Sequence, residues 1–361
     1  MILTIPVLPK QNNFNFIRLF CCFLVISMHV LDLSGTVSIL RPIFDGHVAV
    51  CVFFILSGFW VTKSFLSSKN LKEYFVKRSI RILPLYYISV GGGLVAFAFA
   101  SEFPIKEFFT NAETWKYLFW NCIFLNFMHP TLPGCFDGKF IAVNGALWTI
   151  KIEIAFYVVL PILIWFFKKK KSLKQLNISF LVLYVLSILY TFILSRYANA
   201  LHLPEQLANQ FPAFVSCFAS GMFLFFNWDW ILKKINLLIV PSVIIFALHY
   251  VLKTEFLMPI SLSLICVFFS TRFTFLGSIG SKKDYSYPLY LFHFPLIQLM
   301  AHFNFYTDCF PLALFLTFAG TYFISVLAVK LVDALALAGV AKPLLSERRE
   351  RRNGAVAEPR T

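Results

Sequence analysis

The chain has 361 residues, of which 59% are hydrophobic and 14% are charged, and its formal net charge is +15. Soluble domains carry about 25% charged residues, so this composition excludes a soluble fold. The basic residues stand between apolar stretches, where they set membrane topology, and we therefore expect no nucleic acid among the partners.

Ten apolar stretches have the length of membrane-spanning helices. A helix rising 1.5 Å per residue needs about 20 residues to cross about 30 Å of hydrocarbon. A membrane β-barrel would require alternating polar and apolar residues, and this pattern is absent. We predict an all-α, polytopic membrane bundle with its membrane domain at 14–335. The predicted spans are 15–33, 46–66, 82–100, 144–167, 176–195, 211–227, 235–251, 256–271, 285–302 and 310–332.

Basic residues decide the orientation. The loop 63–81 carries six Lys and Arg residues, which places it in the cytoplasm together with the N-terminal residues 1–13. These first residues contain no small-residue cleavage site, so we expect no removable signal peptide. The last residues, 336–361, form a basic tail that we also place in the cytoplasm.

The stretch 115–128 is apolar but short, and it could either cross the bilayer or lie in its interface. If it crossed, the cluster Lys168 to Lys171 would face outward; if it lies in the interface, the cluster faces the cytoplasm. We predict the second arrangement, with 101–143 as an extracytoplasmic segment that contains an interfacial helix. The Lys and Arg residues then outside are Arg41, Lys106, Lys116, Lys139, Lys151, Arg196 and Lys253.

Ionisable residues inside membrane spans are costly and therefore mark candidate functional sites. Arg18 and His29 lie eleven positions apart on the first span, which is about three helical turns, so both point from one face about 16 Å apart. Arg18 is alternatively an inner anchor, and His29 alternatively a hydrogen-bonded core residue. On the second span, Ser57 and Gly58 are small residues that favour close helix packing, and Ser57 is also a candidate substrate contact.

Arg78 and Arg81 lie three positions apart at the cytoplasmic entry of the third span. Two guanidinium groups on one helical face can hold a phosphate, or they can simply anchor the helix by the positive-inside rule.

Later spans add two more ionisable residues. Glu153 lies about two turns inside the fourth span, where it needs a partner such as His29 or Lys151. His293 lies near the middle of a late span and is either a substrate contact or a structural hydrogen-bonding residue. Trp148, at the start of the fourth span, is a further candidate for substrate contact. No Cys or His spacing matches a metal site.

Five blocks in chain order resemble the acyltransferase-3 family of membrane acyltransferases. They are Arg18 with His29, VCVFFILSGF, RSIRILPLYY, LWTIKIEIAFYVVLP and YSYPLYLFHFP, and the resemblance extends from about Phe14 to Leu335. It implies a ten-helix core in the bacterial inner membrane that moves an acetyl or other acyl group from a cytoplasmic coenzyme A thioester to a sugar. The implied acceptors are lipopolysaccharide, capsule, peptidoglycan or lipid-linked precursors. Some relatives carry an added extracytoplasmic hydrolase-like domain, which we do not expect here.

The resemblance also implies that His29 is catalytic and that Arg18, Arg78 and Arg81 are needed for activity. We expect the arginines to bind the donor phosphates, His29 to act as a base or a nucleophile, and Glu153 to orient it. Acetyl-CoA is expected as the donor substrate, with no permanently bound cofactor, and membrane lipids surround the bundle. The alternative function is a transporter or flippase that uses the same polar residues as a path.

Overall fold

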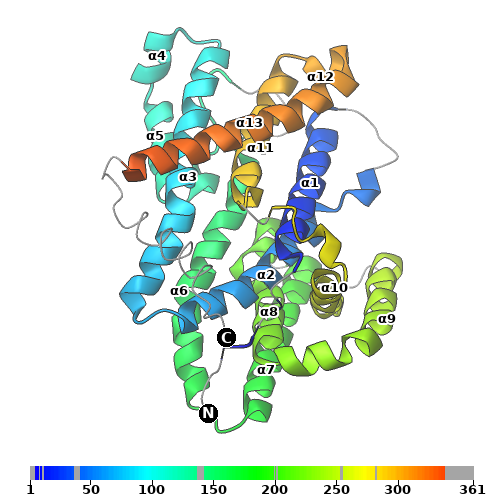
Figure 1. The fold of residues 1–361 in the computed structure, drawn as a ribbon. Helices are drawn as coiled ribbons and strands as arrows, with labels where there is room; N and C mark the ends of the chain where they lie inside the picture. The colour runs from blue at the N-terminus through cyan, green and yellow to red at the C-terminus, as the bar shows by residue number, and fades with distance from the viewer. Residues whose placement is uncertain are drawn as a thin grey trace. The chain divides into compact units, whose positions relative to one another are not determined.

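The computed structural model describes residues 5–7, 9, 12–35, 41–135, 142–198, 200, 202–252, 255–280 and 283–337. Nearly all of the basic tail predicted at 336–361 lies outside these residues, as does Lys139. Within the described residues every regular element is helical, which confirms the predicted fold class (Figure 1).

Among the residues that the structure describes, seven helices are long and apolar enough to cross a membrane. They are α1 (Phe14–Leu33), α2 (Gly46–Leu66), α3 (Leu71–Ala100), α6 (Trp148–Lys168), α7 (Leu173–Tyr197), α9 (Trp228–Leu252) and α13 (Phe310–Leu337). The other three predicted spans fall on shorter helices: α8 (Val215–Phe226, 12 residues), α10 (Met258–Arg272, 15 residues) and α11 (Ser286–His302, 17 residues). The count of ten membrane crossings therefore stays a prediction.

Helix α3 begins eleven residues before the span predicted at 82–100. Its first three turns contain the charged residues of the segment KEYFVKRSIR. These charges keep the first turns out of the hydrocarbon, but they do not prevent the segment from forming a helix. Arg78 and Arg81 are therefore helical residues that precede the apolar part of α3.

The chain forms two compact units. The first unit comprises Met1–Val25, Ile43–Leu71 and Thr149–Asp284, and the second comprises Ile26–Pro42, Lys72–Trp148 and Tyr285–Thr361. Helix α1 contributes its first half to the first unit and its second half to the second unit.

Glycines bring α2 and α8 into direct backbone contact in the first unit. A Cβ atom on Gly58 would lie 2.1 Å from the Phe218 carbonyl oxygen, and one on Gly221 would lie 2.0 Å from the Ile55 oxygen. This is the close packing that small residues permit between membrane helices, and it agrees with the packing interpretation of Gly58. Three short 3-10 helices complete the unit: η4 (Glu205–Asn209), η5 (Phe211–Phe214) and η6 (Thr274–Leu276).

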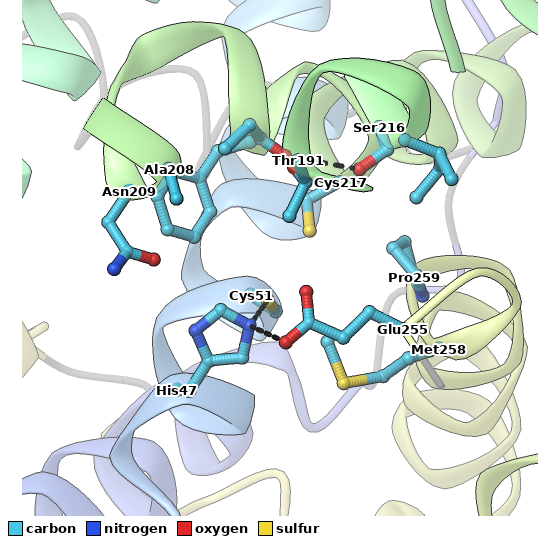
Figure 2. Close-up of a pocket in the computed structure, with 13 residues that line it drawn as sticks. His47, Cys51, Thr191, Ala208, Asn209, Ser216, Cys217, Glu255, Met258 and Pro259 are labelled. Carbon is cyan, nitrogen blue, oxygen red and sulfur yellow. Dashed lines mark hydrogen bonds and ion pairs between the residues drawn. The ribbon is translucent and has the colours of Figure 1, made fainter. Parts of the chain in front are cut away.

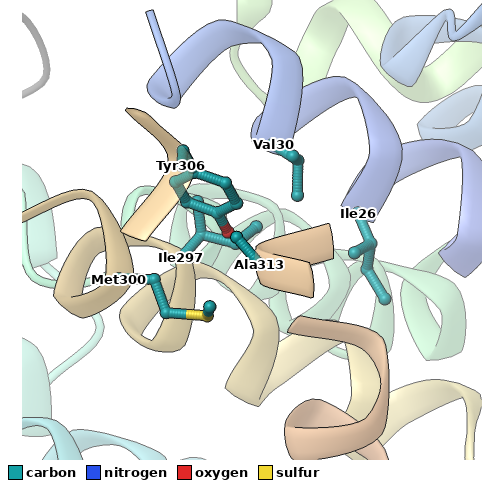
Figure 3. Packing of buried hydrophobic residues seen from close by; sticks show 6 residues of the cluster. All are labelled: Ile26, Val30, Ile297, Met300, Tyr306 and Ala313. Carbon is teal, nitrogen blue, oxygen red and sulfur yellow. The ribbon is translucent and has the colours of Figure 1, made fainter. Parts of the chain in front are cut away.

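Aliphatic side chains fill the core of the second unit between α1, α11, α12 (Phe305–Asp308) and α13 (Figure 3). Ile26 and Val30 of α1 meet Ile297 and Met300 of α11 in this cluster. The Tyr306 hydroxyl, buried beside them, is hydrogen-bonded to Thr317 at 2.7 Å. The cluster holds together the halves of α1 and α11 that carry His29 and His293.

In its described residues, 101–135 and 142–143, the segment predicted to lie outside the membrane contains short helices. These are α4 (Ile105–Thr110), α5 (Ala112–Cys122) and η2 (Asn126–Met128), and η3 (Gly145–Leu147) follows them before α6. Helix α5 has 11 residues and so rises only about 16 Å, too little to cross the hydrocarbon core. Trp115 and Phe119 expose more than half of their surface on one face of α5, as an interfacial helix requires.

Two kinds of residue weaken helix geometry in the second unit. Pro295 lies inside α11 and has no N–H to give to the Leu291 carbonyl. Helix α3 contains three consecutive glycines, and a Cβ atom added to Gly91 or Gly92 would have no neighbour within 4 Å.

Candidate active site

The two histidines that the sequence analysis singled out in apolar spans meet in the second unit. The Nδ1 atom of His29 on α1 lies 2.9 Å from the Nε2 atom of His293 on α11. The rings are nearly parallel, with centroids 5.1 Å apart. His293 is fully buried and His29 is half-buried, so His29 is the member of the pair that a substrate can reach.

The hydrogen bonds fix which nitrogen carries each proton. The Nδ1 atom of His293 lies 2.8 Å from the Tyr290 carbonyl oxygen, which can only accept. Neutral His293 therefore donates from Nδ1 and accepts at Nε2, and His29 must donate from its own Nδ1. In this arrangement the lone pair of His29 is on Nε2, where the imidazole can accept a proton.

The turn of α11 that carries His293 is held by polar groups from two other segments. The Leu291 carbonyl, which Pro295 leaves without its helical donor, accepts hydrogen bonds from Ser89 Oγ at 3.1 Å and Asn144 Nδ2 at 2.8 Å. Ser89 and Asn144 are both buried, and Asn144 also donates to Ser89 at 3.3 Å. The buried side chains of Ser89 and Asn144 would be costly in hydrocarbon without partners, and both are satisfied by the one backbone carbonyl that lacks its helical donor.

The segment after Asn144 also packs against α11. The Asn144 side chain accepts from Ala146 N at 3.2 Å, and Tyr290 donates its hydroxyl hydrogen bond to the Ala146 carbonyl at 3.3 Å. Gly145 has no side chain where the Phe294 ring lies: a Cβ atom there would come within 2.7 Å of the ring. The same Phe294 ring packs edge-on against His29, with centroids 5.0 Å apart.

Arg78 and Arg81 are half-buried and three positions apart on α3, as predicted. The neighbouring Lys77 is already neutralised, because its amine lies 2.6 Å from the Glu73 carboxylate.

Arg18 belongs to the first unit, where it has an acidic neighbour that the sequence analysis did not single out. Its guanidinium lies 3.6 Å from the Asp284 carboxylate and 3.3 Å from the Asn15 side-chain oxygen. The guanidinium carbon also lies 5.8 Å from the centre of the Trp60 ring, within cation–π range. A donor phosphate at Arg18 would have to share the guanidinium with Asp284.

The remaining candidates lie on α2 and α6. Glu153 belongs to the first unit and accepts a hydrogen bond of 2.5 Å from the Tyr157 hydroxyl one turn later. Its pairing with His29 stays a prediction. Ser57 is half-buried beside the glycine contact of α2, and Trp148 is half-buried at the first position of α6. Their predicted contacts with substrate are likewise untested.

A second polar cluster lines a small cavity in the first unit (Figure 2). His47 Nε2 lies 3.9 Å from Glu255 Oε1 and 3.6 Å from Cys51 Sγ. The cavity holds about 20 Å³, room for about one water molecule, so neither an acyl thioester nor a sugar fits it. In the part of the chain that the structure describes, no group of three or more His, Cys, Asp and Glu side chains could hold a metal ion.

The second unit contains a larger hollow between α3, α11 and α13, of about 400 Å³. Its lining is almost entirely apolar; the polar exception is Ser89, the residue that bonds the Leu291 carbonyl. Phe292 and Pro295 line it on the side of α11, one residue before and two after His293.

The sequence reasoning missed Asn144, Ser89, Tyr290 and Asp284. A signal for the first two was present in FHFP, because a proline inside a membrane helix leaves the carbonyl four residues earlier in need of a donor. No comparable signal points to Asp284, whose relation to Arg18 depends on the path of the chain after α10.

Comparison with known proteins decides the family. A family described as acyltransferase domain matches residues 11–330, nearly the whole chain. This protein belongs to the acyltransferase-3 family. Together with its long apolar helices, this membership makes the chain a multi-pass membrane acyltransferase and sets aside the transporter alternative.

Three relatives show how far this acyltransferase resembles other proteins. It is 24% identical over 324 residues to the O-acetyl transferase of Shigella phage Sf6, covering 82% of this chain and 89% of that protein. It is 28% identical over 185 residues to nodulation protein 10 of Rhizobium leguminosarum bv. viciae, where the match covers 45% of this chain and 46% of that protein. The match to an uncharacterized protein of Haemophilus influenzae is 26% identical over 238 residues, 60% of this chain and 94% of that protein. The chain thus spans about half the length of the rhizobial relative, and no solved structure matches it.

Proposed function

We propose that this acyltransferase moves an acetyl group from cytoplasmic acetyl-CoA to a sugar hydroxyl of a cell-surface polysaccharide, lipopolysaccharide or lipid-linked glycan, and that it works in the bacterial inner membrane. The observation that carries the proposal is the His29–His293 pair, which leaves a basic nitrogen on the more accessible ring. The name of the phage relative, O-acetyl transferase, supports acetyl as the group transferred and oxygen as the acceptor atom.

In the proposed reaction, His29 acts as a general base. Its Nε2 atom takes the proton of the acceptor hydroxyl while the hydroxyl oxygen bonds to the thioester carbonyl carbon. The carbon–sulfur bond then breaks, the acetyl group remains on the sugar as an ester, and the departing sulfur takes the proton from His29 to give free coenzyme A. His293 stabilises the positive imidazole by continuing to accept from its Nδ1–H.

Arg78 and Arg81 are proposed to bind the phosphates of coenzyme A, because a pair of guanidinium groups one turn apart suits a polyanion. Arg18 is proposed as a further donor-binding residue, in exchange for its contact with Asp284. Glu153 keeps the supporting role predicted from the sequence, which is to favour the protonated form of His29.

The proposal is tested with purified protein in lipid nanodiscs, acetyl-CoA and a glycan extract as acceptor. We expect release of coenzyme A together with alkali-labile acetyl groups on the glycan. Replacing His29 by Ala should remove both products while acetyl-CoA still binds. Full activity in His29→Ala, or coenzyme A release with no acetylated glycan, would refute the proposed reaction.

A further inference from the structure

Asn144 is a buried amide at the start of the NGALW segment, and it contacts the α11 carbonyl that Pro295 leaves without its helical donor. Its Nδ2 group donates to the Leu291 carbonyl at 2.8 Å, and Ser89 donates to the same oxygen at 3.1 Å. Resting on the proposed function, we propose that Asn144, assisted by Ser89, is a positioning residue that sets His293 and through it the base His29.

The Leu291 carbonyl explains why an amide is needed at this place. In an unbroken helix the N–H at position 295 would bond the carbonyl at 291, but proline has none. Without Asn144 this carbonyl would keep only the longer hydrogen bond from Ser89, at 3.1 Å, and the turn of α11 would shift to improve that contact. The carbonyl lies two residues before His293, within the same helical turn, so this shift moves the imidazole.

A displacement of His293 would change the position of the reacting nitrogen, His29 Nε2, through two contacts. His293 Nε2 accepts from His29 Nδ1 at 2.9 Å, and this bond, together with the bond of His293 to the Tyr290 carbonyl, places the lone pair of His29 on Nε2. Phe294, the next residue, packs edge-on against His29 and also fills the space left by Gly145. Asn144 therefore acts on both of the side chains that orient His29, without contact to a substrate.

The first experiment compares Asn144→Ala with Asn121→Ala. Asn121 is a matched control, because it is also a buried amide that donates two hydrogen bonds, in its case to the carbonyls of Tyr117 and His129. We expect Asn144→Ala to lower kcat for acetyl transfer between about 10-fold and 100-fold with KM for acetyl-CoA unchanged, as a small misplacement of a catalytic group does. Asn121→Ala should keep kcat within about twofold, with melting temperatures measured on the same samples.

The second experiment restores the missing N–H. Pro295→Ala supplies the helical donor to Leu291, so Asn144→Ala should lower kcat much less in that background than in the natural one. An equal loss in both backgrounds overturns the proposal, as does wild-type kcat in Asn144→Ala or a loss no larger than that of Asn121→Ala. If Pro295→Ala is itself inactive, the comparison with Asn121→Ala decides.

The two levels of inference fail differently. If His29→Ala keeps its activity, the proposed function fails, and the positioning role proposed for Asn144 fails with it. If His29→Ala is inactive while Asn144→Ala behaves like Asn121→Ala, the reaction stands and only the positioning role is wrong.

Discussion

His29 and His293 have unequal chemical roles because the Nδ1 atom of His293 is bonded to the Tyr290 carbonyl, which can only accept. His293 has a fixed donor and a fixed acceptor, whereas His29 presents the nitrogen that can take a proton. General base catalysis contributes about 10²-fold to 10⁴-fold to a rate. We expect His29→Gln, which keeps size and hydrogen bonding but cannot accept the proton, to lose at least that factor in kcat.

His293→Gln should be less damaging, because an amide oxygen can still accept from His29 Nδ1. Product formation at saturating acetyl-CoA, with expression matched, measures the difference between the two variants. If His293→Gln proves inactive and His29→Gln active, the roles are reversed and His293 is the base.

Arg78 and Arg81 can be tested against a neighbour on the same helix. Each charge-assisted hydrogen bond to phosphate contributes about 1.5–3 kcal/mol, so the double Ala variant should raise the Kd for acetyl-CoA by at least about tenfold. Lys at both positions should restore only part of the affinity, because it lacks the planar fork. The control is Lys77→Ala, whose amine is bound to Glu73, and calorimetric titration gives the constants. An unchanged Kd in the double variant would leave both arginines as topology anchors.

Single residues also show the limits of sequence reasoning. The helical period places Arg18 and His29 on one face of the first predicted span. Because ionisable groups are costly in an apolar span, each of them needs a partner. The helical period cannot choose that partner, because partners come from helices distant in sequence: His29 meets His293, and Arg18 meets Asp284. The predicted importance of His29 and His293 was available from their burial in apolar stretches, but their contact was not.

At the scale of elements, the α2–α8 contact depends on two glycines, Gly58 and Gly221, which have no side chain to hold the helices apart. Adding Cβ to Gly58 places it 2.1 Å from a backbone oxygen, which cannot move without shifting a helix. We expect Gly58→Ala to destabilise the protein by about 1–3 kcal/mol, as overpacking does, and to lower the unfolding temperature in nanodiscs. The adjacent Ser57→Ala is the control and should leave the unfolding temperature nearly unchanged. Equal unfolding temperatures for Gly58→Ala and the unchanged protein would show that the helices separate at little cost.

Helices were predictable wherever the apolar stretch was long. All ten predicted spans fall on helices, because apolar length and backbone hydrogen bonding together leave no other structure in lipid. The ends were less predictable: α3 extends back to Leu71, since charge stops a span but does not stop a helix. The short length of α8 depends on how it packs, and hydropathy does not predict it. Hydropathy likewise does not show that Pro295 removes a backbone hydrogen bond from α11.

For the whole molecule, the positive-inside distribution predicts the side of each loop. Cys309 is exposed at the end of α12, on the side predicted to be outside, and Lys169 follows α6 on the side predicted to be cytoplasmic. An impermeant maleimide should label Cys309 in intact spheroplasts and should reach Lys169→Cys only after the membrane is opened. The opposite pattern would reverse the orientation.

A second thiol on the predicted outer side, that of Cys135, should remain unlabelled in that experiment. Burial raises the pKa of Cys135 to about 11, so at neutral pH its thiol remains protonated and reacts slowly. Labelling of Cys135 should rise only as the pH approaches that value. Cys309→Ser serves as the control and should remove nearly all of the label at neutral pH.

The glycine triplet of α3 has a consequence for handling the protein outside its membrane. Within lipid, a helix tolerates Gly91 and Gly92 because no water competes for their backbone hydrogen bonds. In a detergent micelle water reaches this turn, and each glycine weakens the helix by about 1 kcal/mol relative to alanine. Ser89, which helps to hold the turn of His293, lies two residues before the triplet. Solubilised enzyme should therefore lose activity while its circular dichroism is still that of an intact helical bundle, and Gly91→Ala with Gly92→Ala should prolong its working life in detergent.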